Sequence, residues 1–373
     1  MLSKVLYKTV KVPGKPLLST TRQGQAPEAG VATAGSGSTR KNRLEFLDFL
    51  RFVAAFSVLI QHACEKVFPS FAYFCTHYFQ FGVFGVTLFF LCSGFVIPVS
   101  LEKSHSLKKF WINRVFRLYP LYLVSIVSTL LLIRAGVYRR PMPGLTDILA
   151  NLTMLQKFIS RPSILHLYWT LCLEMLFYIM ISAVFVLGLL KKTAGLAIFS
   201  LSITLLIGVL GTQVFHLFTS GWGTAYYFST MFIGFLYYRY YKNQVPKAVF
   251  TGIVLSALGV LLLITYFNLY HKDQPEFLGT LSFLPVTLAI LAAYGLFTIC
   301  FLRRERQYPA FLIVLGVISY SLYLVQGTVF AIFPAIGHPV VSVIVWLSAI
   351  TVISYGTYHL IEKPFISMGK KLQ

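Results

Sequence analysis

Long apolar runs follow one another along most of the chain. From residue 46 onward there are ten such runs of roughly 17–25 residues, the length a helix needs to cross the hydrocarbon core of a bilayer. They fall at 46–66, 79–101, 118–134, 166–190, 194–214, 220–238, 248–268, 278–301, 311–332 and 338–360. The pattern predicts an all-α fold, a polytopic transmembrane helix bundle of about ten spans, occupying residues 44–373.

The first 43 residues have a different pattern. They are rich in Lys, Gly, Ala, Ser and Thr and include a GSGST run. Such a segment buries too little apolar surface to offset its ordering entropy. It also lacks the apolar core and small-residue cleavage site of a signal peptide. We therefore expect residues 1–43 to form a basic, largely disordered tail.

Composition and charge support a membrane protein. Hydrophobic residues make up 57% of the chain and charged residues 12%, about half the charged share of a soluble domain. The net charge of +21 would suggest nucleic acid in a soluble chain, but here it fits the excess of Lys and Arg in cytoplasmic loops. With the N-terminus inside, 24 of the 32 basic residues fall in cytoplasmic segments and seven in outer ones. Both termini are therefore expected in the cytoplasm, with membrane lipid and not nucleic acid as a partner.

Motifs of several common site types are absent. The five cysteines are scattered and have no metal-ligand spacing, so no metal site is expected. There is no P-loop, no GxGxxG before a helix and no HExxH. No internal repeat is evident, which weighs against transporter folds built from duplicated halves.

The first span carries the strongest candidate for chemistry. Arg51 and His62 are eleven residues apart in LDFLRFVAAFSVLIQH, which places both on one helix face about 16 Å apart along the axis. Ionisable groups inside a span are costly and mark functional sites by default. Ala54, Ala55 and Val58 lie near this face, and small residues there allow a neighbouring helix or a ligand to approach closely. The stripe predicts a substrate path; the alternative is a snorkelling Arg and a His bonded to a neighbouring helix.

Basic residues cluster around the third span. Arg114 and Arg117 are three positions apart just before it, where their guanidinium groups are placed to bind phosphates. Anchoring of the helix on the cytoplasmic side is the better explanation of these residues taken alone. In the second span Ser93 permits close helix contact, and Pro98 is expected to break the helix near its inner end.

Three later spans hold further polar residues. Glu174 lies among apolar residues in HLYWTLCLEMLFY, at a depth that allows a pair with His62, and such a pair would make the imidazole more basic. Tyr320, Tyr323 and Gln326 share one helix face, and they either line a polar cavity or bond to neighbouring helices. Pro364 is expected to end the last span.

Six segments, in order along the chain, resemble motifs of the acyltransferase-3 family, bacterial membrane enzymes that O-acetylate cell-surface glycans. LDFLRFVAAFSVLIQH resembles the Arg-x10-His motif, and FFLCSGFVI the Ser-Gly-Phe segment. RVFRLYPLY is similar to the basic motif and LYWTLCLEMLFY to the Trp-x-Leu-x-x-Glu-x-x-Phe-Tyr motif. ISYSLYLVQ and HLIEKPF look like the last two. The resemblance covers about residues 44–369.

The resemblance implies an acyl-CoA-dependent O-acyltransferase of the inner membrane. The donor would be cytoplasmic acetyl-CoA, and the acceptor a hydroxyl of a cell-surface polysaccharide or lipid-linked glycan such as lipopolysaccharide O-antigen. By the same carry-over, His62 is the base, Glu174 supports it, and Arg51, Arg114 and Arg117 hold the coenzyme. The supporting and substrate-lining positions would be Asp48, Ser93, Trp169, Tyr178, Tyr320, Tyr323 and Gln326. Many family members carry His where this chain has Gln326, so a proton relay through the ninth span is not expected.

Two functions of other classes stay open from the residues alone. A proton-coupled exporter would use His62 and Glu174 as a relay, although it has no use for acetyl-CoA. A catalytically silent scaffold would have no need of Arg51, His62 and Glu174.

Overall fold

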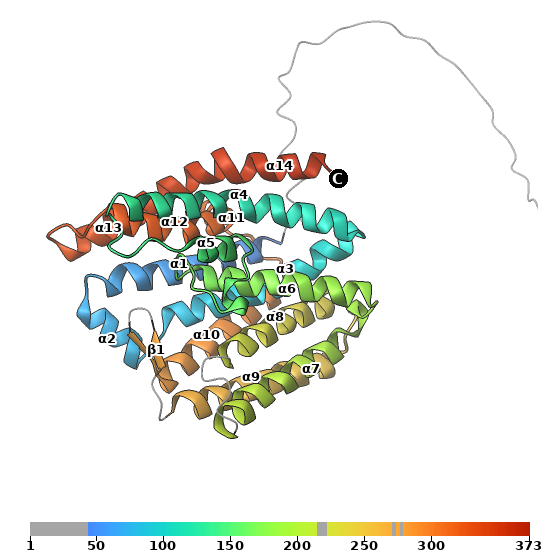
Figure 1. Cartoon of the computed structure of the whole chain (residues 1–373). Coiled ribbons are helices and arrows are strands. Elements are labelled where there is room, and N and C mark those ends of the chain that lie inside the picture. Colours follow the sequence, from blue (N-terminus) through green and yellow to red (C-terminus); the bar gives the residue numbers. More distant parts are fainter. Residues whose placement is uncertain (1–43, 215–221, 271–273, 277–278) are drawn as a thin grey trace, which may run out of the picture. The chain divides into compact units, whose positions relative to one another are not determined.

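The computed structural model describes residues 44–214, 222–270, 274–276 and 279–373. The predicted N-terminal tail lies outside the described residues. From Leu44 onward the chain forms one compact unit in which long helices run side by side (Figure 1). In chain order the elements are α1 (Glu45–Glu65), α2 (Pro69–His77), α3 (Phe81–Ser104), α4 (Leu107–Arg134), α5 (Leu145–Leu152), η2 (Gln156–Ile159), α6 (Tyr168–Val186), η3 (Leu190–Lys192), α7 (Thr193–Leu205), η4 (Leu206–Val214), α8 (Trp222–Tyr241), α9 (Lys247–Leu269), β1 (Gln274–Glu276), β2 (Gly279–Leu281), α10 (Phe283–Leu302), α11 (Ala310–Val317), α12 (Ser319–Ile332), α13 (Pro339–Thr357), η5 (Tyr358–Glu362) and α14 (Lys363–Lys371).

The predicted all-α membrane fold is confirmed. In the part of the chain that the structure describes, eight helices are long and apolar enough to span a bilayer. The pair α11 and α12, bent by 64°, makes a ninth if it is one span. The sequence pattern did not predict the short antiparallel hairpin of β1 and β2, which precedes α10.

The span predicted at 220–238 corresponds to α8, a helix of 20 residues that is not among the eight apolar ones. Its six tyrosines and Arg239 lower its mean hydropathy. The helix lies inside the bundle, and all of residues 229–239 are buried. Several of its tyrosine hydroxyls form hydrogen bonds there, for example Tyr226 with Thr87 at 2.8 Å and Tyr237 with Thr298 at 2.6 Å. Burial against other helices, rather than contact with lipid, accounts for this composition.

Two prolines do not break helices where the sequence predicted it. Pro98 lies inside α3, which continues to Ser104, because membrane helices tolerate proline where neighbouring groups satisfy the freed backbone. Pro364 occupies the first turn of α14, directly after the π-helical turn η5. The last apolar span therefore continues to Lys371.

Glycines allow α3 to approach its neighbours at backbone distance. A Cβ at Gly94 would overlap the carbonyl of Met231 on α8, and one at Gly85 would overlap the carbonyl of Ala54 on α1. Small residues at such contacts let membrane helices pack closely. Through these contacts α3 holds α1 and α8 in fixed positions.

Replacement of Gly94 by alanine is expected to destabilise the bundle. The added methyl group must separate α3 from α8, and overpacking of this kind costs about 1–3 kcal/mol. Thermal unfolding of the purified protein in detergent measures the effect. Gly252→Ala on α9 is the matched control, because nothing lies within 4 Å of its added Cβ. Equal melting temperatures for the two variants would contradict the tight contact.

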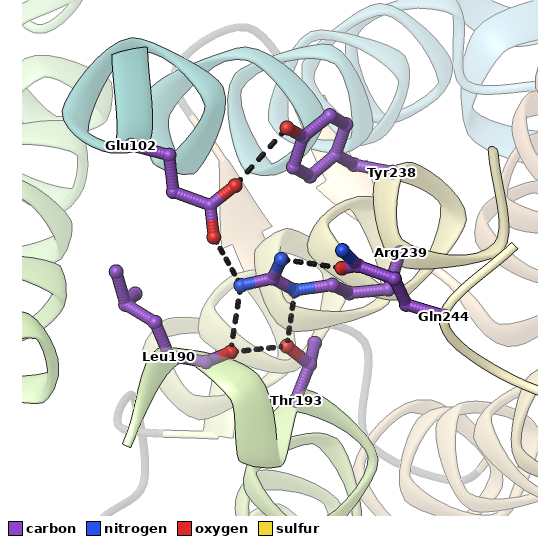
Figure 2. A network of polar contacts seen from close by, with 6 residues as sticks. All are labelled: Glu102, Leu190, Thr193, Tyr238, Arg239 and Gln244. Carbon is purple, nitrogen blue, oxygen red and sulfur yellow. Dashed lines mark hydrogen bonds and ion pairs between the residues drawn. The ribbon is translucent and has the colours of Figure 1, made fainter. Parts of the chain in front are cut away.

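A buried arginine joins three elements at one end of the bundle (Figure 2). Arg239 of α8 is 3% exposed and pairs with Glu102 of α3. Its guanidinium also donates to the Thr193 hydroxyl at 3.0 Å, the Leu190 carbonyl at 2.8 Å and the Gln244 side chain at 2.7 Å. The network fixes the ends of α3 and α8 to the start of α7.

Loss of this guanidinium is expected to be costly. Removing one partner of a fully buried ion pair costs about 3–5 kcal/mol, and because Glu102 is one quarter exposed we expect Arg239→Leu to cost about 2–3 kcal/mol. Arg161→Leu is the control, since its 3.5 Å pair with Asp147 is exposed and such pairs contribute about 0–1 kcal/mol. Thermal unfolding of both variants decides the point; similar losses would mean that the network adds nothing beyond a surface pair.

Candidate active site

Part of the stripe on α1, from Ala54 to His62, lines two adjacent cavities. The first is narrow and is lined by Ala54, Ala55 and Val58 from α1 together with Leu171 and Tyr323. Its walls are almost entirely apolar. The second contains His62 and shares Val58, Val86 and Tyr323 with the first. The small residues of the stripe therefore lie beside the apolar cavity, and the imidazole lies in the cavity next to it.

His62 is half-buried and lines a third cavity as well. His166, in the loop before α6, lines both cavities that contain His62. Burial and the charge of Lys157 lower the pKa of His166 below its ordinary value. Glu65, one turn beyond His62 on α1, also lines the second cavity.

Aromatic rings form one wall of the His62 cavity. Trp169 of α6 and Tyr227 of α8 both line it, with ring centroids 5.3 Å apart. On the opposite side the Gln61 amide donates to Gln80 at 2.9 Å. The imidazole thus lies in a polar, partly aromatic chamber and not against lipid alone.

The polar face of α12 forms as predicted, with its hydroxyls in interhelical bonds. Tyr320 donates to the Leu118 carbonyl at 2.8 Å, and Tyr323 donates to the Leu167 carbonyl at 3.0 Å and accepts from Thr170 at 2.9 Å. Both tyrosines also line the first cavity. Gln326 lines the third cavity beside His62, and its buried Oε1 has no hydrogen-bond partner among the described residues.

The three predicted arginines gather at the other end of the stripe. Arg51 interacts electrostatically with Arg117 and with Asp48, and Arg114 interacts with Arg117. The Arg114 guanidinium is 5.3 Å from the ring centroids of both Phe110 and Tyr178. The Nε atoms of Arg51 and Arg114 are buried without a hydrogen-bond partner in the part of the chain described. Buried donors of this kind have capacity to bind an anion.

Glu174 belongs to this arginine cluster and not to the His62 chamber. It is 6% exposed, accepts a hydrogen bond from Tyr178, and interacts electrostatically with Arg51 and Arg114. Arg51 is about 16 Å along the helix from His62, so the predicted Glu174–His62 pair is replaced by a contact at the opposite end. The prediction of equal depth for Glu174 and His62 rested on the span boundaries. Those boundaries do not fix how one helix is shifted along its axis against another.

The remaining predicted residues occupy nearby positions. Asp48 is buried on α1, and its backbone touches Gly316 of α11. The buried Ser93 hydroxyl has no hydrogen-bond partner within the described ranges. Sequence reasoning did not assign a role to Glu362, which is 2% exposed, accepts from Ser321 and interacts with Arg117. No group of three potential metal ligands occurs among the described residues.

Curated proteins similar to this chain carry acyltransferase names. "Putative acetyltransferase ORF330" of Acidianus two-tailed virus is 26% identical over 252 residues, 66% of this chain and 72% of that protein. The acyltransferase MdmB of Streptomyces mycarofaciens is 29% identical over 37% of this chain and 38% of its own length. "Putative O-acetyltransferase SACOL0978" of Staphylococcus aureus strain COL is 24% identical over 90% of this chain.

This chain spans 60% of the length of that staphylococcal relative. No solved structure matches the chain. The family model described as an acyltransferase domain matches residues 44–359, which is most of the chain and nearly all of the helical unit. The match includes the arginine cluster, the stripe on α1 and the His62 chamber. The chain belongs to the acyltransferase-3 family.

Proposed function

We propose that this protein transfers an acetyl group from cytoplasmic acetyl-CoA to a hydroxyl of a cell-envelope glycan, with His62 as the general base. The observation that carries the proposal is the arrangement along α1. A cluster with buried arginine donors lies at one end, an imidazole chamber lies at the other, and the residues between them on α1 line a narrow apolar cavity. This order of groups along α1 suits an elongated donor with an anionic head at one end and a reactive thioester at the other.

The donor end would hold the phosphates of the coenzyme. Arg51, Arg114 and Arg117 provide the positive charge, and the free Nε donors of Arg51 and Arg114 suit phosphate oxygens. Glu174, Tyr178 and Asp48 keep the guanidinium groups in place before the donor binds. The pantetheine arm would lie beside Ala54, Ala55 and Val58, whose short side chains leave the first cavity open.

The transfer itself takes place at His62. The imidazole removes the proton from the acceptor hydroxyl, and the oxygen attacks the thioester carbonyl carbon. A C–O bond forms as the C–S bond breaks, and the proton passes from His62 to the departing thiolate of coenzyme A. General-base help of this kind contributes about 10²–10⁴-fold. A variant in which His62 itself carries the acyl group would give ping-pong kinetics.

The names of the relatives suggest the acyl group, and the charge pattern suggests the orientation of the protein in its membrane. Acetyl is the group named for the viral and staphylococcal relatives. The bias of Lys and Arg favours a bacterial inner membrane with both termini in the cytoplasm. Residues 44–373 would then form the catalytic domain and residues 1–43 a cytoplasmic tail, with lipopolysaccharide O-antigen as the first acceptor to test.

Transfer of radiolabel from acetyl-CoA tests the proposal. Membranes that contain the wild-type protein and labelled acetyl-CoA are expected to yield labelled glycan, which mass spectrometry identifies by its acetyl mass increment. Membranes without the protein give the background. Absence of any labelled product, together with absence of acetyl-CoA binding by the purified protein, would reject the enzyme and favour the exporter.

A further inference from the structure

A large groove lies outside the site described so far, between α6, α7 and α8. Its volume is about 750 Å³, and it is open to the surface. Its walls are mostly apolar, with Met180 from α6, Phe199 and Ile203 from α7, and Phe228 from α8. The lining on α7 and η4 extends from residue 196 to residue 207, about 16 Å along the axis. One leaflet of the hydrocarbon core is about 15 Å thick, so this groove has the depth of a single lipid chain.

Polar groups gather at one end of the groove. Among the described residues that line it, Lys157 of η2 is the only charged one, and its Nζ donates to the Thr224 hydroxyl at 3.3 Å. Ser200 and Thr204, deeper in the groove, are already paired with Ser229. Burial lowers the pKa of Lys157, and an anion beside it would favour its charged form. The groove therefore suits a molecule with a hydrocarbon chain and an anionic head.

The Lys157 end of the groove adjoins the His62 chamber. Lys157 Nζ lies 5.7 Å from the centroid of the Trp169 ring. The same indole packs on Tyr227, and both rings line the cavity that contains His62. A head group bound at Lys157 would therefore lie beside the Trp169 ring, which also lines the His62 cavity. A sugar attached to it would have to pass this ring to reach the imidazole.

We propose that the groove of α6, α7 and α8 binds a lipid phosphate whose hydrocarbon chain lies along it and whose phosphate pairs with Lys157. The acceptor glycan is carried on this phosphate and reaches His62 past Trp169. This inference rests on the proposed function for its final step. It restricts the acceptor to glycans linked to a membrane lipid through phosphate and gives them a lateral entry from the bilayer.

Binding of dodecyl phosphate to the full-length purified protein, followed by native mass spectrometry, tests the site. We expect one bound molecule, and we expect no adduct with dodecanol or with inorganic phosphate. Lys157→Gln removes the charge and Ala183→Trp fills the groove, so each is expected to weaken binding by about tenfold or more. Arg161→Gln removes a charge in the same loop, and Ile198→Trp adds a ring to an exposed position of α7 outside the groove. Both controls should bind as the wild type does, and equal losses in test and control variants would overturn the site.

A short pulse of labelled acetyl-CoA tests the acceptor. Membranes of the organism that encodes the protein should give label that extracts into organic solvent and becomes water-soluble after mild acid cleaves the glycosyl phosphate. Lys157→Gln should lower this product, while Arg161→Gln should not. Label found only in polymer that never passes through the lipid fraction would overturn this inference and leave the transferase intact. No label in any fraction, with dodecyl phosphate still bound, would instead reject the proposed function.

Discussion

His62→Ala is expected to lower acetyl transfer by about 10²–10⁴-fold, the contribution typical of a general base. The donor site lies about 16 Å away along α1, so the affinity for acetyl-CoA should stay within about twofold. His62 is half-buried beside cavities that already exist, and its truncation therefore enlarges a space without opening the packed interface between α1 and α3. Steady-state transfer and equilibrium binding of acetyl-CoA to the same preparation measure the two effects separately.

His338→Ala provides the matched control, because His338 is exposed at the start of α13. Added imidazole gives a second readout, since it fits the enlarged chamber and should restore part of the activity to His62→Ala but not to an unfolded protein. Full transfer activity in His62→Ala would remove this residue from the mechanism. Loss of acetyl-CoA binding by the same variant would show that the two ends of the stripe are not separate sites.

Arg51→Met and Arg114→Met are expected to weaken acetyl-CoA affinity by about 10–100-fold each, because each removes charge-assisted hydrogen bonds to phosphate. The loss should fall on KM rather than on kcat, since the phosphates are bound equally in the ground state and the transition state. A truncated thioester, N-acetyl-S-acetylcysteamine, lacks the phosphates and distinguishes binding of the head from general damage. Its kcat/KM should be nearly unchanged in both variants.

Arg134→Met at the far end of α4 is the control, because Arg134 is exposed and belongs to the predicted opposite side of the membrane. It should use acetyl-CoA and the truncated thioester as the wild type does. An equal loss of activity with both thioesters in Arg51→Met and Arg114→Met would mean that these arginines support the fold or the chemistry and do not bind phosphate.

Helix periodicity and apolar length explain what the sequence could predict. The bilayer sets the length of each span, and Arg51 and His62 share a face for any straight helix. The proximity of Arg114 and Arg117 also followed from sequence, because they lie three positions apart beside the same span. These features depend on residues within one helix, whereas the approach of Arg51 to that pair depends on the relative placement of α1 and α4.

Features made by several helices could not be predicted in this way. The partner of Glu174 depends on how α6 is rotated and shifted against α1, and sequence gives only its approximate depth. His166 and Glu65 enter the chamber because a loop and a helix end meet there. The groove near Lys157 is formed by three helices and η2, and each of their apolar faces taken alone is typical of contact with lipid. The burial of α8 was not predicted either, although the tyrosines in its sequence indicate a helix that does not face the bilayer.

A structure of the protein with a non-hydrolysable thioether analogue of acetyl-CoA tests the central claim most directly. The account predicts the phosphates within hydrogen-bond distance of Arg51 and Arg114, the pantetheine arm beside Ala54, Ala55 and Val58, and the acetyl carbonyl in the chamber with His62. An analogue bound with its acetyl group away from His62, or with its phosphates away from the arginine cluster, would contradict it.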